Sequence, residues 1–260
     1  MRFCGKVIRI FEAKRFTDIT QWQSGCFAQD AVGDWYLCLP AVIPDETSAA
    51  SSAEVGIDLG LKDIAVTSDG DRLAAGQFFR SLEAKIALAQ RRGHPRQAKR
   101  LHRKASRRRH NAQHKFSRMI VNRYQKIVIG DVSSLKLVKT RMAKSVLDCS
   151  WGQLKTQLQY KGEYAGRSVQ IVNERNTSRA CSSCGFLTGP TGVNGLRERF
   201  WVCPGCGAAH DRDVNAARNI LTAERLPPSV YGNEMSQRHA PPSRASRPRK
   251  ARIARGAAAS

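Results

Sequence analysis

Four clustered cysteines give the clearest chemical signal in this 260-residue sequence. Cys181 and Cys184 form one C-x2-C pair, Cys203 and Cys206 form another, and eighteen residues separate the two pairs. Four thiolates at this spacing bind Zn²⁺ tetrahedrally and leave no open coordination position, so the pattern predicts a structural zinc ribbon. The alternative is two disulfides or redox pairs, which a reducing intracellular compartment disfavours.

Two aspartates occupy positions where a sheet could present a catalytic edge. Asp58 ends an apolar strand in VGIDLG, and Asp213 lies at a helix start in DRDVNAARNIL. Hydrolysis of a phosphodiester by two Mg²⁺ ions about 4 Å apart needs about three carboxylates to hold the metals. A helix N-terminus also favours acidic residues, so a simple cap is the alternative role for Asp211 or Asp213.

These residues require a scaffold that brings them to one place. We expect a meander of three antiparallel strands in VGIDLG, DIAVTSDG and RLAAGQ, followed by helices over about 82–124 that break at Gly93-His94-Pro95. Two further strands, KIVIGDV and SVQIVNE, surround a helix over WGQLKTQLQYKGEYAG, for which Asp148 is the expected N-cap. The intervening helices make the last two strands parallel, so the element order predicts an α/β, RNase H-like fold with its active site at the carboxyl ends of the strands.

The charge of the chain points to a polyanionic partner. Forty-four Lys and Arg against twenty-one Asp and Glu give a net charge of +23, which attracts nucleic acid or an acidic membrane surface. We favour nucleic acid, because no segment reads as an amphipathic membrane helix and no apolar run is long enough to span a bilayer. The N-terminus lacks the apolar core of a signal peptide, so we expect a cytoplasmic, nucleoid-associated protein. The scattered cysteines, Cys4, Cys26, Cys38 and Cys149, are expected to be buried.

The strongest local concentration of positive charge lies between Arg91 and Lys115. This segment carries eleven Lys and Arg and no Asp or Glu, whereas a solvated helix face usually mixes both signs. One sign over several turns repels itself unless a polyanion neutralises it, although a merely soluble surface is the alternative. We therefore predict contacts to the nucleic-acid backbone, without base specificity, from Arg91, Arg92, Arg100, Arg103, Lys104, Arg107, Arg108 and Arg109.

Three segments together resemble a known family. VGIDLGLKDIAVTSDG resembles the first RuvC motif of the TnpB (OrfB) proteins encoded by bacterial insertion sequences, and TSRACSSCGF and RFWVCPGCGAAHDRDVNAARNIL resemble the zinc ribbon and third RuvC motif of that family. The resemblance runs from about Gly33 to Leu221. It implies an RNA-guided DNA endonuclease, similar to type V CRISPR effectors and guided by a transcript of its own mobile element. Asp58 and Asp213 then fall on the first and third catalytic acids of the family.

The second RuvC motif departs from the family pattern. Family members have a catalytic Glu before Asp at the end of the fourth strand, where this chain has Gly130-Asp131. Asp131 is no simple replacement, because one residue along a strand turns the side chain to the other face. Glu174 ends the fifth strand, which lies beside the fourth in an RNase H-like sheet, so we predict that it supplies the missing acid, in an arrangement that resembles the eukaryotic Fanzor relatives. The alternatives are a surface Glu near the ribbon and a dead nuclease.

We expect five regions along the chain. They are the remnant of an N-terminal β domain (1–44), an RNase H-like domain with basic helices (45–180), a zinc ribbon (181–210), a final helix (211–226) and a disordered basic tail (227–260). The predicted function is Mg²⁺-dependent, RNA-guided DNA cleavage associated with transposition, with Asp58, Glu174 and Asp213 holding two Mg²⁺ ions. Because family members carry a longer N-terminal region, the rivals are a nuclease-dead RNA-guided DNA-binding repressor and a truncated, non-functional remnant.

Overall fold

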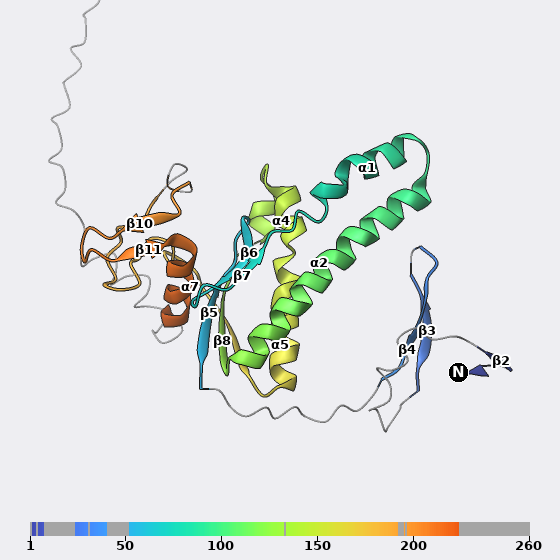
Figure 1. Ribbon diagram of the computed structural model, residues 1–260, viewed down its shortest axis with the longest axis horizontal. Coiled ribbons are helices and arrows are strands. Elements are labelled where there is room, and N and C mark those ends of the chain that lie inside the picture. The colour runs from blue at the N-terminus through green and yellow to red at the C-terminus, as the bar shows by residue number, and fades with distance from the viewer. Residues whose placement is uncertain are drawn as a thin grey trace, which may run out of the picture.

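A five-stranded mixed sheet forms the centre of the computed structural model (Figure 1). The structure describes residues 2–3, 5–7, 24–30, 32–40, 52–132, 134–191, 195 and 197–223. The sheet has the order β7-β6-β5-β8-β9 and consists of β5 (Glu54–Asp58), β6 (Asp63–Thr67), β7 (Arg72–Ala74), β8 (Lys126–Gly130) and β9 (Ser168–Val172). β5, β6 and β7 pair antiparallel, while β8 and β9 run parallel to β5. This order confirms the predicted meander followed by two parallel strands, as in an RNase H-like sheet.

Helices cover both faces of this sheet (Figure 1). The described helices are α1 (Arg80–Arg91), α2 (Pro95–Arg123), α3 (Ser134–Val138), α4 (Ala143–Cys149), α5 (Trp151–Tyr164) and α7 (Arg212–Ala223). α2 and α5 lie on one face, where Ile57, Ile127 and Ile129 join the main apolar core. α7 packs on the other face, and Gly56 permits its approach, because a Cβ at that position would lie 2.0 Å from the carbonyl oxygen of Ala217. The first turn of α7 therefore lies next to the end of β5.

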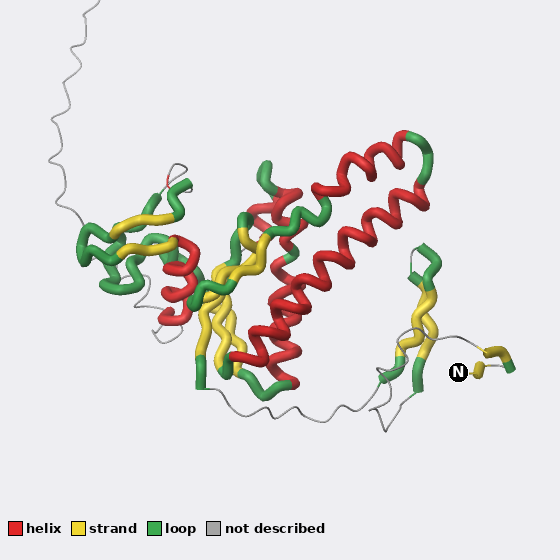
Figure 2. Tube along the Cα trace, viewed as in Figure 1, coloured by secondary structure: helices red, strands yellow, loops and turns green. Residues whose placement is uncertain are grey.

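α1 and α2 form a helical hairpin that projects beyond the sheet (Figure 2). The expected break at Gly93-His94-Pro95 is confirmed. Gly93 adopts a φ of +69°, and Pro95 starts α2, where a backbone N–H would have no partner within the helix. Leu82 of α1 and Ala105 of α2 belong to a small apolar core of their own. The hairpin therefore forms an arm that carries the basic segment.

The remaining described strands form three two-stranded ladders. They are β1 (Arg2–Phe3) with β2 (Lys6–Val7), β3 (Cys26–Gln29) with β4 (Trp35–Cys38), and β10 (Phe200–Val202) with β11 (Ala209–Asp211). β10 and β11 lie between β9 and α7, so the ribbon segment directly precedes the helix that carries Asp213. The predicted basic tail and most of the predicted linker lie outside the described residues. Among the helices described, none is both long and apolar enough to cross a membrane.

The expected N-cap role of Asp148 is wrong. Asp148 lies inside α4, and Ser150, with a φ of +52°, precedes α5 in the capping position. The buried Asp148 carboxylate instead accepts hydrogen bonds from the backbone nitrogen of Phe79 at 3.0 Å and from Arg109 Nη1 at 3.3 Å. Both partners are distant in sequence, so local capping signals could not reveal them.

The scattered cysteines differ in their environment. Cys149 is buried in the main core, as expected. Cys26 and Cys38 are exposed, which corrects the expectation that they are buried. They face each other as the first and last residues of the β3–β4 ladder, which is a separate two-stranded ladder and not part of the central sheet. Cys4 lies outside the described residues.

Candidate metal centres

Three carboxylates from separate elements line one cavity of about 370 Å³. Asp58 stands at the end of β5, Glu174 follows β9 by two residues, and Asp213 lies in the first turn of α7. The parallel ladders align the ends of β5, β8 and β9 at one edge of the sheet, and α7 starts beside that edge. The fold therefore brings together the three acids that the sequence singled out.

Glu174 lies over Gly130, the position at which the family pattern has an acid. Gly130 pairs with Val172 in the β8–β9 ladder, and Glu174 follows two residues later, in step with the two-residue alternation of side chains. A Cβ on Gly130 would lie 3.0 Å from Glu174 Oε2 and 2.9 Å from Ile220 Cδ1. The absence of a side chain at position 130 therefore leaves the space that the Glu174 carboxylate uses.

Asp131 makes its contacts away from this cavity. Its carboxylate accepts a hydrogen bond from Lys155 Nζ of α5 at 2.6 Å, and its side chain is 63% exposed. α5 covers the face opposite α7, as expected if one further residue turns the side chain to the other side of the sheet. Asp131 is also absent from the described residues that line the cavity.

Asp211 and Asp213 divide the two roles that the sequence left open. Asp211 Oδ1 accepts hydrogen bonds from the backbone nitrogens of Asp213 at 3.0 Å and of Val214 at 3.1 Å. Asp211 is thus the cap of α7. Asp213 is not needed for capping, and its carboxylate lines the cavity instead.

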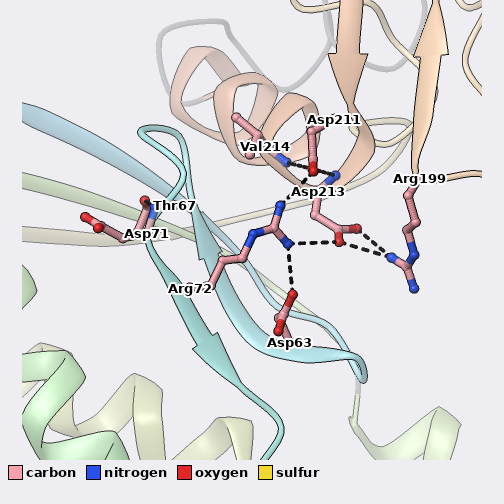
Figure 3. A network of polar contacts seen from close by, with 8 residues as sticks. All are labelled: Asp63, Thr67, Asp71, Arg72, Arg199, Asp211, Asp213 and Val214. Atoms are coloured by element: carbon pink, nitrogen blue, oxygen red, sulfur yellow. Dashed lines mark hydrogen bonds and ion pairs between the residues drawn. The ribbon is translucent and has the colours of Figure 1, made fainter.

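Two arginines contact the Asp213 carboxylate (Figure 3). Arg199 Nη1 lies 3.0 Å from both carboxylate oxygens, and Arg72 Nη1 lies 3.7 Å from Oδ2. Arg199 comes from the ribbon segment, just before β10, whereas Arg72 comes from β7 at the edge of the sheet. Sequence reasoning missed both residues, because nothing local marks a single arginine as facing a site that distant segments assemble.

Burial and repulsion raise the pKa of two of the acids. Burial raises the pKa of Asp58 well above its usual range, and the negative charges of Glu174 and Asp213 add to this effect. Burial also raises the pKa of Glu174, and the negative charge of Asp131 adds to this effect, against the opposing charge of Lys155. Carboxylates that resist ionisation beside one another are stabilised by a bound cation, and oxygen donors of this kind suit Mg²⁺. The donor chemistry of the acid cluster therefore fits a magnesium site, and metal binding would have to draw the three carboxylates together, because they are not among the described groups whose ligand atoms already lie within 4.8 Å of one another.

The four clustered cysteines form the second candidate centre. Their Sγ atoms lie within 4.8 Å of one another, with 3.6 Å between Cys184 and Cys203 and 3.7 Å between Cys181 and Cys206. Zn–S bonds of about 2.3 Å in a tetrahedral site place the sulfurs about 3.8 Å apart, much further than in a disulfide. His210 Nε2 lies 3.0 Å from Cys181 Sγ and adds a contact outside the thiolate set. The cluster therefore suits a structural zinc ion, as predicted.

The basic arm turns most of its predicted cations toward solvent. The exposed ones are Arg91, Arg92, Arg100, Lys104, Arg107 and Arg108, of which Arg107 also donates a hydrogen bond to Tyr36 Oη of β4. Arg103 Nη1 lies 2.6 Å from Asp30 Oδ2 in the β3–β4 turn and is half-buried. Arg109 pairs with the buried Asp148, and its side chain is 19% exposed. Arg109 therefore holds α2 against α4 and has little surface left for a ligand.

The fold and the two centres define an RNase H-like protein with an inserted zinc ribbon and a cluster of convergent acids. Comparison with known families gives two matches. The Cas12f1-like TNB domain matches residues 151–220, and a family of the OrfB protein of IS605, described as "Probable transposase", matches residues 38–141. The chain belongs to the TnpB (OrfB) family of IS605-type insertion sequences. The resemblance inferred from the sequence motifs is thereby confirmed.

Individual relatives are similar over most of this chain. A "Putative RNA-guided DNA endonuclease" of Streptomyces pristinaespiralis is 33% identical over 213 residues, which are 75% of this chain and 51% of the relative. The Cas12f1 endodeoxyribonuclease of Sulfoacidibacillus thermotolerans is 29% identical over 217 residues, or 74% and 50% of the two chains. A Cas12f1 structure with sgRNA and target DNA has the same fold, with a TM-score of 0.52, 20% identity, and coverage of 73% of this chain and 54% of that one. The chain thus spans about half the length of the curated relatives it matches.

Proposed function

We propose that this chain acts in Mg²⁺-dependent, RNA-guided cleavage of DNA. The observation that carries the proposal is the convergence of Asp58, Glu174 and Asp213 on one cavity, with Glu174 in the space above Gly130. Relatives named RNA-guided DNA endonucleases, and the fold shared with a Cas12f1–sgRNA–target DNA complex, support the choice of nucleic acids. The basic arm supplies a surface for their phosphate backbones.

In this mechanism Asp58, Glu174 and Asp213 would hold the metals, and a phosphodiester would bind at the cavity that they line. Bound Mg²⁺ would activate a water and stabilise charge on the leaving oxygen. Burial and the charges of Glu174 and Asp213 raise the pKa of Asp58, so a bound cation would have to lower this pKa for Asp58 to ionise beside them. Arg199 now contacts both oxygens of Asp213, so it must release at least one of them when a metal binds.

A cleavage assay tests this function. The protein is co-expressed with the transcript from the 3′ end of its element and incubated with Mg²⁺ and a DNA library with randomised flanks. We expect wild type to cut the library. Asp58→Asn and Asp213→Asn should each cut more than ~100-fold more slowly, a larger loss than is typical of residues that only support the metal ligands. Both variants should still bind DNA, because neither lies on the basic arm.

The same assay separates the rivals. Binding without cutting by wild type would favour a nuclease-dead, RNA-guided DNA-binding protein, the alternative that Gly130 supports because the usual acid is missing there. A wild-type protein that neither bound nor cut the library would contradict the proposed function.

A further inference from the structure

Arg72 links three acidic residues through a single guanidinium (Figure 3). Its Nη1 lies 2.8 Å from Asp63 Oδ2, and its Nη2 lies 2.7 Å from Asp211 Oδ2. Asp213 Oδ2 is 3.7 Å from Nη1. The planar fork of an arginine can serve two carboxylates at once, which a lysine ammonium does with much less directional control.

Asp211 connects this contact to α7, the helix that carries Asp213. One of its oxygens binds Arg72, and the other accepts the backbone N–H groups of Asp213 and Val214. The guanidinium of Arg72 is therefore connected to the main-chain nitrogen of Asp213 through the carboxylate of Asp211. A shift of Arg72 would move the cap and the first turn of α7 with it.

The other end of the link lies in the sheet that carries Asp58. Val66 of β6 pairs with Asp58 on one side and with Arg72 on the other, so these three residues form one row across β5, β6 and β7. Asp63, the second anchor of the guanidinium, starts β6. Arg72 thus joins the strand row of Asp58 to the first turn of α7.

We propose that Arg72 is a positioning residue, which sets the separation of Asp58 and Asp213 by fastening the α7 cap to the meander. The inference rests on the proposed magnesium site. Residues that orient metal-binding carboxylates typically affect metal affinity by 10–100-fold without touching the metal. Loss of the link leaves both acids present but misplaced for a shared pair of ions.

The charge of Arg72 has the opposite effect on metal binding, and the test must separate the two. A guanidinium close to Asp213 repels a cation, so removing its charge would by itself strengthen metal binding. Arg72→Lys keeps the charge and loses the fork. Asp211→Asn keeps an oxygen that can cap α7 and weakens the ion pair. Arg123→Lys is the matched control, because Arg123 Nη1 forms a comparable pair with Asp71 Oδ2 at 2.6 Å, on the surface.

The experiment measures Mn²⁺ affinity by calorimetry, and the Mg²⁺ concentration for half-maximal cleavage, in the full-length protein with its guide transcript. We expect Arg72→Lys and Asp211→Asn each to lower the Mn²⁺ affinity, and to raise the Mg²⁺ concentration for half-maximal cleavage, by about tenfold. Arg123→Lys should match wild type in both quantities. The double variant should be no worse than either single one, because both break one link. As a control, the zinc content and the melting temperature of each variant are measured. Values close to those of wild type show that the variant is folded.

Each outcome decides between the proposals. Equal metal affinity in wild type, Arg72→Lys and Asp211→Asn would overturn the positioning role and leave the magnesium site standing. Tighter binding in these variants, neither of which loses the positive charge at position 72, would overturn the positioning role as well, because misplaced acids bind a metal more weakly. If wild type bound no Mn²⁺ and cut no DNA, the proposed function itself would fail, and this inference with it.

Discussion

At the scale of single residues, the position of the proposed second catalytic acid is the main departure from the family pattern. Gly130 occupies the usual position, and Glu174 fills the space above it from the neighbouring strand end. The motifs predicted Asp58 and Asp213, and strand adjacency predicted Glu174; the structure places all three at one cavity, and their catalytic role stays a prediction. It could not reveal Arg72 or Arg199, because each acts across segments whose contact depends on the completed fold.

Replacing Gly130 by alanine tests the spatial relation to Glu174. The new Cβ would meet Glu174 Oε2 at 3.0 Å and Ile220 Cδ1 at 2.9 Å, so the carboxylate or α7 must shift. We expect about a tenfold loss of cleavage, measured as the rate at saturating Mg²⁺. Gly152→Ala in α5 is the control, since its Cβ would meet nothing within 4 Å. It should cut normally and gain about 0.5–1 kcal/mol of stability, and normal cutting by Gly130→Ala would contradict the steric argument.

The raised pKa of Asp58 predicts how stability depends on pH. An acid whose pKa is higher in the folded state stabilises the fold at low pH, and this stabilisation is lost as the pH rises from the usual carboxyl range through the raised value. At neutral pH without Mg²⁺, Asp58→Asn should therefore melt higher than wild type, by about 3 °C for 1 kcal/mol. The difference should shrink toward pH 5.

Thermal melts in Mg²⁺-free buffer without chelator, which retains the zinc, provide this measurement. Added Mg²⁺ should raise the melting temperature of wild type and leave that of Asp58→Asn nearly unchanged. An Asp58→Asn variant that melted below wild type at neutral pH would mean that the acid cluster carries no repulsion.

At the scale of elements, the basic arm combines an exposed arginine and a structural arginine at two adjacent positions. Arg108 is exposed on α2, whereas Arg109 is turned inward to Asp148. The charge run predicted the arm, and its break at 93–95, from the sequence alone. Which arginines face outward depends on where α4 packs, and on the turn between β3 and β4 that engages Arg103.

Alanine substitutions at these adjacent positions should have contrasting effects. Arg108→Ala should lower the salt dependence of nucleic-acid binding by about one ion released, with no change in melting temperature. Arg109→Ala should keep the salt dependence and lose about 2 kcal/mol of stability, because it leaves Asp148 buried with fewer partners. Filter binding over a salt series and denaturant unfolding measure the two effects. Equal loss of salt dependence in both variants would contradict the inward role of Arg109.

At the scale of the whole molecule, the zinc ribbon and the acid cluster are joined by the chain itself. The ribbon segment ends in β11, whose last residue, Asp211, caps α7. It also supplies Arg199 to Asp213. The meander, the parallel crossovers and the ribbon were predictable from hydrophobic pattern and cysteine spacing, whereas the pairing of the last two strands was inferred from the resemblance to an RNase H-like sheet. The cap of α5 was not, because Asp148 is engaged by Phe79, the residue before α1, and by Arg109 of α2.

The most direct test of the account compares the two acids that could replace the missing one. Glu174→Gln and Asp131→Asn remove one charge each with little change in shape, and Glu163→Gln, exposed on α5, controls for the substitution itself. Cleavage of the DNA library is measured with each variant and its guide transcript. We predict that Glu174→Gln loses more than ~100-fold of the rate, while Asp131→Asn and Glu163→Gln cut like wild type. Full cleavage by Glu174→Gln, with loss in Asp131→Asn, would contradict the relocated acid.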